Sequence, residues 1–137
     1  MKPRIYLSGP IYATTDQEQE WRKTATKKLE KFYDVLDPLK RNFRKTKFNT
    51  VNSVTITKQD LQEIDHAHVV LANCFRAGWG TSMEIFYAHM KGKPVLFFNA
   101  GNNPSPWLFA HARNVKTLLV AIGELKKLRK TIISCIL

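Results

Sequence analysis

Residues 68–99, HVVLANCFRAGWGTSMEIFYAHMKGKPVLFFN, contain two apolar runs on either side of a helical pattern. The runs 68–75 and 93–99 are rich in aliphatic and aromatic residues, which predicts two buried strands. The stretch that follows the RAGWG turn predicts a helix. Its buried face is expected to carry Met83, Phe86, Tyr87 and Met90. A helix between two strands in this order is typical of parallel strands joined by a crossover.

The preceding sequence continues the alternation. Residues 4–8, RIYLS, predict a strand that stops at a Gly-Pro pair, and residues 33–38 predict a second strand. Between them, 15–32 predict a helix that opens with a capping box of Thr15 and Glu18. We expect a polar connection over 39–55 and a short helix over 57–67, opened by Thr57.

The remaining sequence predicts a polar loop, a helix over 107–113, a strand or helix start over 114–122 and a last helix over 122–130. Strands alternate with helices throughout, which predicts an α/β fold with a parallel five-stranded sheet covered by helices on both faces. We expect one domain over residues 1–137, with a basic and apolar C-terminal tail at about 124–137.

The chain is strongly basic. It has 22 Lys and Arg residues against 11 Asp and Glu, a formal net charge of +11 over 137 residues. This excess favours an anionic partner such as a nucleotide, although the basic runs 22–31 and 126–130 are better explained as solvated helix faces. No apolar run is long enough for a membrane helix. With only Cys74 and Cys135, a disulfide framework is not expected, so a reducing, cytoplasmic location is predicted.

Ligands of parallel sheets bind where the carboxyl ends of the strands meet. The predicted loops at this edge are SGPI (8–11), DPLKRNF (37–43), NCFRAGWGTSME (73–84) and NAGNNPSPW (99–107). They bring together several polar and charged side chains, so this edge is the expected place for chemistry.

Glu84 follows Thr81 by three residues, and this spacing has two interpretations. Glu84 is either part of a capping box or a nucleophile kept ionised in the first helical turn by the helix dipole. Asp60 follows Thr57 in the same way, and it is either a cap or a general acid; two carboxylates with separate roles are the usual means of cleaving glycosidic bonds. Tyr6 is a core residue by default, but its hydroxyl can orient Glu84 if it points into the crevice.

Metal and cofactor motifs are not recognised. His66, His68, His89 and His111 lack the spacing of metal ligands, and only His111 is expected near the crevice. Neither of the common glycine-rich phosphate loops occurs. We therefore expect no metal and no cofactor.

Six segments occur in an informative order: IYLSGPI, EWR, LDPLKRNFR, DLQEIDHAHVVLAN, GTSMEIFYAHMKGKPV and SPWLFAHA. Together they resemble the nucleoside 2-deoxyribosyltransferase family and its nucleotide N-hydrolase relatives, over about residues 4–122. The resemblance implies a flavodoxin-like, Rossmann-type sheet. It also implies cleavage or exchange of the N-glycosidic bond of 2′-deoxynucleosides or their 5′-monophosphates.

The resemblance also implies roles for particular residues. Glu84 matches the nucleophile that forms a deoxyribosyl-enzyme, Asp60 the carboxylate that assists protonation of the leaving base, and Tyr6 the tyrosine that hydrogen-bonds the nucleophile. The loop 100–107 matches a segment often contributed by a neighbouring subunit, which implies a homodimer or higher homo-oligomer. The residues expected to contact substrate are Ser8, Gly9, Pro10, Ile11, Arg41, Asn42, Arg44, Arg76, Gly80, Thr81, Met83, Asn103 and Ser105.

One departure from the family pattern concerns the substrate. Gly78 stands where relatives often carry a serine that holds a 5′-phosphate or an aspartate that binds the base. Arg41, Arg44 and Arg76 are candidates to replace the phosphate contact. Base preference and acceptor stay open.

Two other function classes remain. A catalytically inactive nucleotide-binding module would keep the fold and pocket without turnover. Nucleic-acid binding through the basic surface is disfavoured because the sequence has no recognised module for it.

Overall fold

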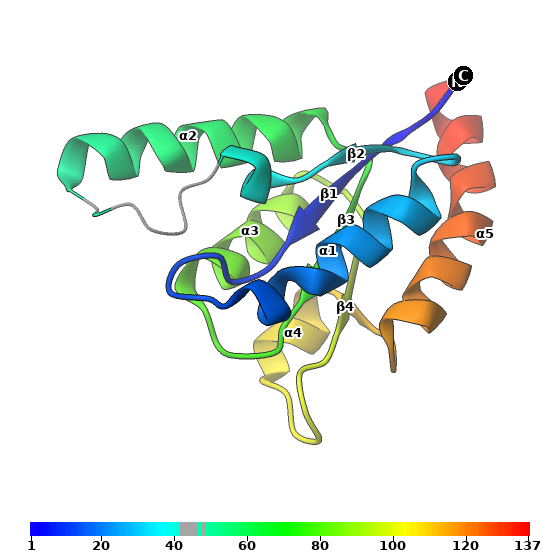
Figure 1. Ribbon diagram of the computed structural model, residues 1–137. Helices are drawn as coiled ribbons and strands as arrows, with labels where there is room; N and C mark the ends of the chain where they lie inside the picture. The colour runs from blue at the N-terminus through cyan, green and yellow to red at the C-terminus, as the bar shows by residue number, and fades with distance from the viewer. Residues whose placement is uncertain (42–46, 48) are drawn as a thin grey trace.

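The computed structural model describes residues 1–41, 47 and 49–137. Over these residues it shows a parallel sheet of five strands with helices on both faces, as predicted (Figure 1). The strands are β1 (Arg4–Ser8), β2 (Asp34–Leu36), β3 (Val69–Asn73), β4 (Val95–Phe98) and β5 (Arg113–Asn114). The helices are α1 (Asp16–Leu29), the short 3-10 helix η1 (Pro38–Arg41), α2 (Thr50–His66), α3 (Trp79–Met90), α4 (Pro106–His111) and α5 (Leu118–Ile136).

The strand order is β2-β1-β3-β4-β5, which is the flavodoxin-like order that the resemblance implied. The chain moves outward in one direction from β1 to β2 and in the other from β3 to β5. The reversal therefore lies between β1 and β3, and the carboxyl ends of these two strands form the edge where such folds bind ligands.

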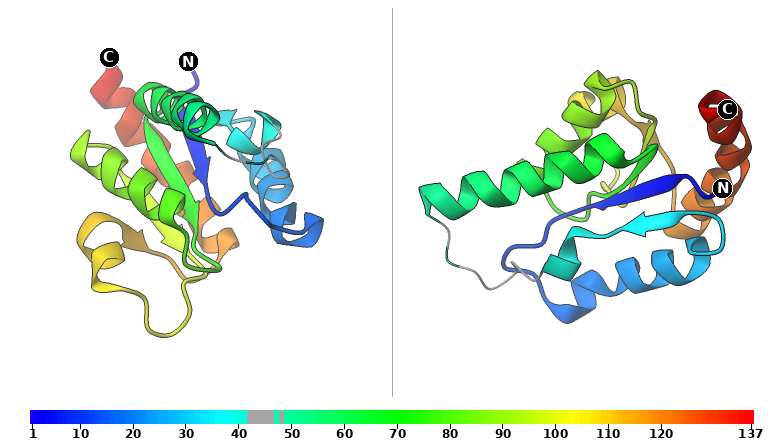
Figure 2. Two further views of the ribbon diagram at one scale, coloured as in Figure 1. Left: turned by 90° about the vertical axis from the view of Figure 1, so that its left-hand side faces the viewer. Right: turned by 90° about the horizontal axis from the view of Figure 1, so that it is seen from above.

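Alternating side chains of the strands supply two separate cores. On one face, Ile5 and Leu7 of β1 pack with Trp21 of α1 and Leu125 of α5. On the other face, Tyr6 belongs to the core that α2 and α3 cover. Figure 2 shows these helix layers from two further directions. Because successive strand side chains point to opposite faces, Tyr6 is directed toward α2 and α3.

The start of α1 is as predicted, and the start of α2 is not. Thr15 and Glu18 form the predicted capping box, with the Glu18 amide 3.1 Å from Thr15 Oγ1. Helix α2 begins at Thr50, with Asn49 as its N-cap. The interpretation of Thr57 as a cap is therefore wrong, and the predicted loop over 39–55 is shortened from both ends by η1 and α2.

The predicted register of α3 is also wrong. The helix begins at Trp79 with Gly78 as its N-cap, so Thr81 lies inside it and Glu84 falls in the second turn. Its buried side includes Thr81, Ile85 and Ala88, whereas Met83 is 64% and Met90 is 66% exposed. Apolar residues occur on several sides of this helix, so periodicity alone did not identify the side that packs on the sheet.

At the C-terminal end, the last helix is longer than predicted. Helix α5 begins after its N-cap Thr117 and continues to Ile136, so the basic tail at 124–137 is mostly helical. Leu125 and Ile132 bury the inner side of α5 against the sheet. Arg129 donates to the Met1 carbonyl oxygen at 3.3 Å, and the two chain ends accordingly lie near each other (Figure 1).

Cys74 and Cys135 are both free thiols. Among the helices of the described residues, none combines the length and the apolar character needed to span a membrane. The cytoplasmic location stays a prediction.

Candidate active site

A cavity of about 610 Å³ opens at the carboxyl ends of β1 and β3, where the strand order reverses. We call it the Glu84 cavity. Three parts of the chain surround it: the loop after β1, the middle of α2, and the loop from β3 into α3. Its lining residues are Tyr6, Gly9, Pro10, Ile11, Tyr12, Pro38, Ser53, Ile56, Thr57, Asp60, Arg76, Ala77, Gly78, Trp79, Gly80, Thr81 and Glu84.

The carboxylate of Glu84 is held by two hydroxyl groups of β1. The Tyr6 hydroxyl donates to Glu84 Oε2 in a short hydrogen bond, and Ser8 Oγ donates to Glu84 Oε1 at 3.0 Å. Tyr6 and Ser8 are both fully buried, so their hydroxyls have little freedom to turn away. The predicted contact between Tyr6 and Glu84 is therefore present, and the capping interpretation of Glu84 is wrong.

Burial changes the titration of this group. Desolvation raises the pKa of Glu84 to about 7; the hydrogen bond from Tyr6 opposes this shift and the charge of Asp60 adds to it. The expectation of a carboxylate kept ionised by a helix terminus is therefore wrong, because Glu84 lies one turn further along and is desolvated. Near neutral pH both the ionised and the protonated forms are populated.

Asp60 projects from α2 into the same cavity. Arg41 of η1 forms an ion pair with Asp60 and another with Glu63, one helical turn further along α2. Desolvation raises the pKa of Asp60, and the Arg41 guanidinium opposes this rise. A carboxyl group with a raised pKa retains its proton more readily, which suits a general acid.

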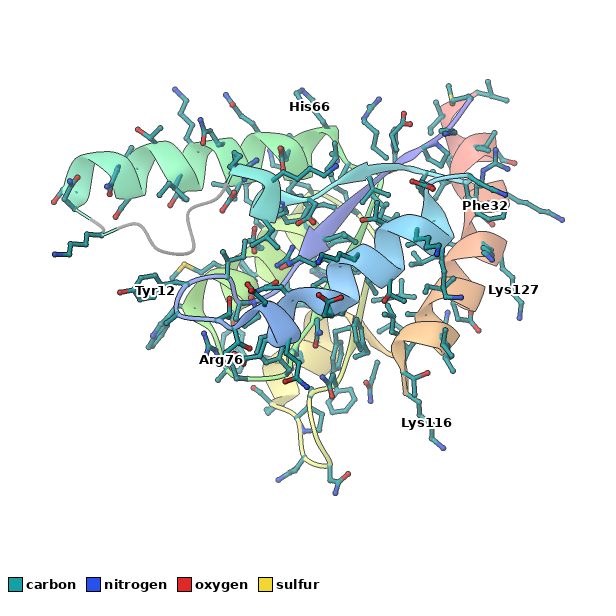
Figure 3. All side chains as sticks on the ribbon, in the orientation of Figure 1. Tyr12, Phe32, His66, Arg76, Lys116 and Lys127 are labelled. Carbon is teal, nitrogen blue, oxygen red and sulfur yellow. The ribbon has the colours of Figure 1, made fainter. Side chains whose placement is uncertain are left out.

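Arg76 connects two loops at the mouth of the cavity. Its Nη2 donates to the Tyr12 carbonyl oxygen at 2.6 Å and its Nη1 to the Ala13 carbonyl oxygen at 3.4 Å. Figure 3 shows Arg76 and Tyr12 on these adjoining loops. Arg41 and Arg76, both predicted to contact substrate, are thus already engaged with protein groups.

A second cavity, of about 410 Å³, lies on the other side of the segment 76–82. We call it the aromatic cavity, because Phe86, Trp107 and His111 line it. Trp107 and His111 stack with ring centroids 5.8 Å apart. The predicted substrate contacts Asn103 and Ser105 line this cavity, and so do Arg76, Gly78 and Thr81, which also line the Glu84 cavity.

The other predicted contacts divide into three groups. Gly9, Pro10, Ile11, Gly80 and Thr81 line the Glu84 cavity. Met83 lies outside both linings, with 64% of its surface exposed. The predictions for Asn42 and Arg44 fall outside the described residues.

Sequence reasoning missed two contributions to the site. Ser53, Ile56 and Thr57 line the cavity from the part of α2 that was predicted to be a loop or a helix cap. Arg22 of α1 is buried and donates a hydrogen bond to the loop after β1. The sequence pattern of α1 gave no signal for this contact.

Metal binding has no support in the described part of the chain, where no group of three or more His, Cys, Asp or Glu side chains is arranged to hold an ion.

Comparisons with known proteins identify the family and the fold. The sequence profile of the nucleoside 2-deoxyribosyltransferase family matches residues 5–121. A comparison with curated proteins gives no significant match.

Several solved structures share the fold. A 2-deoxyribosyltransferase from Bacillus psychrosaccharolyticus has a TM-score of 0.66, at 19% identity over 90% of both chains. The CMP N-glycosidase of Clostridium botulinum has a TM-score of 0.57, at 19% identity over 89% of this chain and 97% of that one. The molybdenum cofactor carrier protein of Chlamydomonas reinhardtii also has a TM-score of 0.57, at 14% identity over 93% of this chain and 98% of that one.

The flavodoxin-like sheet and its two carboxylates define an α/β protein with Asp60 and Glu84 in a cavity at the edge where such folds bind ligands. The family match then makes the assignment: this chain belongs to the nucleoside 2-deoxyribosyltransferase family. Membership supports an enzyme that acts on the glycosidic bond of nucleosides.

Proposed function

We propose that this protein cleaves or exchanges the N-glycosidic bond of 2′-deoxynucleosides or their 5′-monophosphates through a covalent deoxyribosyl-Glu84 intermediate. The observation that carries the proposal is the pair of hydrogen bonds from Tyr6 and Ser8 to Glu84, inside a cavity that Asp60 also lines. A binding module has no need for a desolvated, oriented carboxylate, so this arrangement favours catalysis.

In the first step, an oxygen of ionised Glu84 attacks the anomeric carbon and the bond from that carbon to the base nitrogen breaks. The departing base takes a proton from the protonated form of Asp60, directly or through water; burial favours this form and the Arg41 guanidinium disfavours it. Deoxyribose has no 2′-hydroxyl group, which makes the oxocarbenium-like transition state easier to reach. Tyr6 and Ser8 keep Glu84 in one orientation for the attack.

In the second step, water or another base attacks the same carbon from the face that the first base left. The bond to Glu84 breaks, Asp60 accepts the proton of the attacking group, and the configuration at the anomeric carbon is retained overall. The identity of the acceptor decides between N-hydrolase and transferase.

A 5′-phosphate has a suitable place at the start of α3. The backbone from Gly78 to Thr81 lines the Glu84 cavity at the N-terminus of this helix, where the helix dipole favours an anion. Arg76 lies beside it, although two of its nitrogens already donate to backbone carbonyls. We therefore propose a preference for 5′-monophosphates, as for the CMP N-glycosidase that shares the fold.

The aromatic cavity supports a homo-oligomer in which the loop 100–107 serves a neighbouring subunit. Trp107 is 71% exposed, Phe109 55% and Phe86 45%, which is an unusual amount of exposed aromatic surface in one place. Asn103 and Ser105 lie beside it and away from Glu84 of their own chain. Mixing Glu84→Gln with Asn103→Ala tests the shared site, because mixed oligomers regain activity only if Asn103 acts across the interface.

The test of the proposed function is incubation with a panel of deoxynucleosides and 5′-monophosphates, with and without an acceptor base, followed by chromatography of the free base. We expect base release in the absence of an acceptor or base exchange in its presence. If no member of the panel reacts while one binds tightly, the protein is instead an inactive nucleotide-binding module.

A further inference from the structure

Arg22 is the largest of the fully buried side chains, and it is 1% exposed. A guanidinium group in such a place is strongly destabilising unless hydrogen bonds and an opposite charge compensate it. Its Nε donates to Gln19 Oε1 at 2.7 Å, and its Nη1 donates to Asp37 Oδ1 at 2.8 Å. Two further hydrogen bonds go to the backbone of β1 and of the loop that follows it.

Those two backbone acceptors lie on either side of Ser8. Arg22 Nη1 donates to the Leu7 carbonyl oxygen at 2.9 Å, and Nη2 donates to the Gly9 carbonyl oxygen at 3.0 Å. The pairing of β1 with β2 ends at Tyr6 and Leu36, so Arg22 bonds the Leu7 carbonyl just past the end of β2. The backbone that carries the Ser8 hydroxyl is therefore fixed on both sides.

Gly9 contributes to the same close packing. A Cβ atom at this position would lie 3.1 Å from the Trp21 ring, 3.3 Å from the Asn73 carbonyl oxygen and 3.4 Å from Arg22 Nη2. The loop thus approaches α1 and β3 more closely than most Cβ atoms approach their neighbours. This approach brings the Gly9 carbonyl within reach of the guanidinium.

Asp37 extends the connection to the second carboxylate. The Oδ1 atom that accepts from Arg22 also accepts from the Leu39 amide at 3.0 Å, which fixes the start of η1. Helix η1 carries Arg41, and Arg41 is ion-paired with Asp60. One buried guanidinium therefore connects the backbone beside Glu84 to the element that holds Asp60.

We infer that Arg22 is a positioning residue of this active site: it holds the Ser8 hydroxyl against Glu84 and, through Asp37 and η1, holds Arg41 against Asp60. The expected effect of Arg22 on catalysis rests on the proposed function. Its expected effect on the pKa of Glu84 does not. The positive charge of Arg22 lowers the pKa of Glu84, against the effect of burial.

The experiment compares Arg22→Met, Arg22→Lys and a matched control, Arg129→Met. Arg129 also donates to backbone carbonyls, of Phe32 at 3.0 Å and of Met1 at 3.3 Å, but it does so on α5 at the opposite end of the strands. Circular dichroism and thermal unfolding establish that each variant is folded.

The first measurement is the titration of Glu84 by infrared difference spectroscopy, with Glu84→Gln subtracted to assign the carboxyl signal. Arg22→Met is expected to move the titration midpoint to higher pH by about one pH unit, because a nearby positive charge is lost. Arg22→Lys and Arg129→Met are expected to keep the midpoint of the unmodified protein. This measurement needs no substrate, so it decides the inference even if no nucleoside reacts.

The second measurement is kcat and KM on whichever substrate the panel identifies. Arg22→Met and Arg22→Lys are both expected to lower kcat by roughly 10²-fold with little change in KM. Methionine donates no hydrogen bonds, and a lysine ammonium cannot reproduce the planar guanidinium group that donates to several acceptors at once. Arg129→Met is expected to keep the kcat of the unmodified protein.

The outcomes distinguish a failure of the inference about Arg22 from a failure of the proposed function. A folded Arg22→Met variant with an unchanged Glu84 midpoint overturns the inference whether or not a substrate is found, and a folded variant with unchanged kcat overturns its catalytic consequence. If Arg22→Met does not fold, Arg22→Lys carries the test: a kcat equal to that of the unmodified protein overturns the inference, and a selective loss of kcat supports it. Absence of base release by the unmodified protein counts against the proposed function alone.

Discussion

The two cavities on either side of the segment 76–82 are built in different ways. In the Glu84 cavity, the chain itself supplies a partner for each carboxylate: Tyr6 and Ser8 bond Glu84, and Arg41 pairs with Asp60. The aromatic cavity instead places large aromatic side chains at the surface, with Trp107 71% exposed. The two carboxylates are thus oriented within one chain, whereas the neighbouring aromatic surface has the exposure expected for contact with another molecule.

The two cavities also differ in how their ionisable side chains titrate. In the Glu84 cavity, burial raises the pKa of Asp60 and raises that of Glu84 to about 7, so the proton content of Glu84 changes near neutral pH. Cys74 lines the aromatic cavity, and burial raises the pKa of its thiol to about 11, so it stays protonated and unreactive. The two carboxylates therefore make the first region the expected place for acid–base chemistry.

The largest expected effect comes from removing the nucleophile. Glu84→Gln keeps the size of the side chain but cannot form the ester, so base release should fall by at least roughly 10⁴-fold. The measurement is initial-rate chromatography of the free base. A folded variant that retains the rate of the unmodified protein would show that Glu84 is not the nucleophile.

A stability measurement on the same variant controls for misfolding. The pKa of Glu84 is raised from 4.5 to about 7 in the folded state, so between these values the native protein binds more protons than the unfolded chain. The contribution of Glu84 to stability therefore falls as pH rises from about 4.5 to about 7. Glu84→Gln should consequently be more stable than the unmodified protein at pH 8, by a few kcal/mol, and should lose this advantage near pH 5.

Replacing the proposed acid should have a smaller effect that depends on substrate. Asp60→Asn is expected to slow base release by roughly 10²- to 10⁴-fold for bases that need a proton to leave. Bases that leave readily without one should be affected less. Kinetics on a series of substrates with different leaving bases measures this dependence. Equal losses across the series would indicate that Asp60 has a structural role only.

Tyr6→Phe should act through the orientation and charge of Glu84. The variant loses one hydrogen bond to a charged group, worth about 1.5–3 kcal/mol, which corresponds to a loss of roughly 10- to 10²-fold in kcat/KM. That bond lowers the pKa of Glu84, so its removal should raise this pKa and move the acidic limb of the rate profile to higher pH. The pH dependence of kcat/KM tests this, and an unshifted limb would contradict the role.

The smallest expected effect concerns Gly78, which lines both cavities. A Cβ atom here would meet the Pro10 ring at 3.4 Å, an ordinary contact, so Gly78→Ser should be tolerated. The added hydroxyl should raise kcat/KM for a 5′-monophosphate by roughly two- to tenfold, the value of one neutral hydrogen bond. The free deoxynucleoside serves as the internal control and should change little. Equal gains on both substrates would place the phosphate elsewhere.

Much of the fold could be predicted because its strands are short apolar runs that end at turn residues. The runs at 4–8, 68–75 and 93–99 correspond to β1, β3 and β4. Helix starts depended on finer signals: the Thr15 capping box was predicted, but Asn49 was missed as the cap of α2 because it lies in a polar stretch without periodicity. The side of α3 that packs on the sheet is set by tertiary packing, which its sequence pattern does not reveal.

The sequence predicted which residues line the site better than it predicted how they are arranged. Glu84, Asp60 and Tyr6 were predicted, and they line one cavity. The capping interpretations of Glu84 and Asp60 were wrong because both helices begin further upstream. Arg22 could not be found by periodicity, because its burial depends on carbonyl groups at the end of β1, which the pattern of α1 does not reveal.

The most direct test of the central claim is to look for the intermediate itself. The protein is mixed with a reactive substrate, quenched with acid within the first turnover and digested, and the peptides are analysed by mass spectrometry. The account predicts a peptide containing Glu84 that is heavier by one deoxyribosyl unit, or by its 5′-phosphate when a monophosphate is used, and no such peptide from Glu84→Gln. Base release in the first turnover with an unmodified Glu84 peptide, or with the sugar attached to another residue, would contradict it.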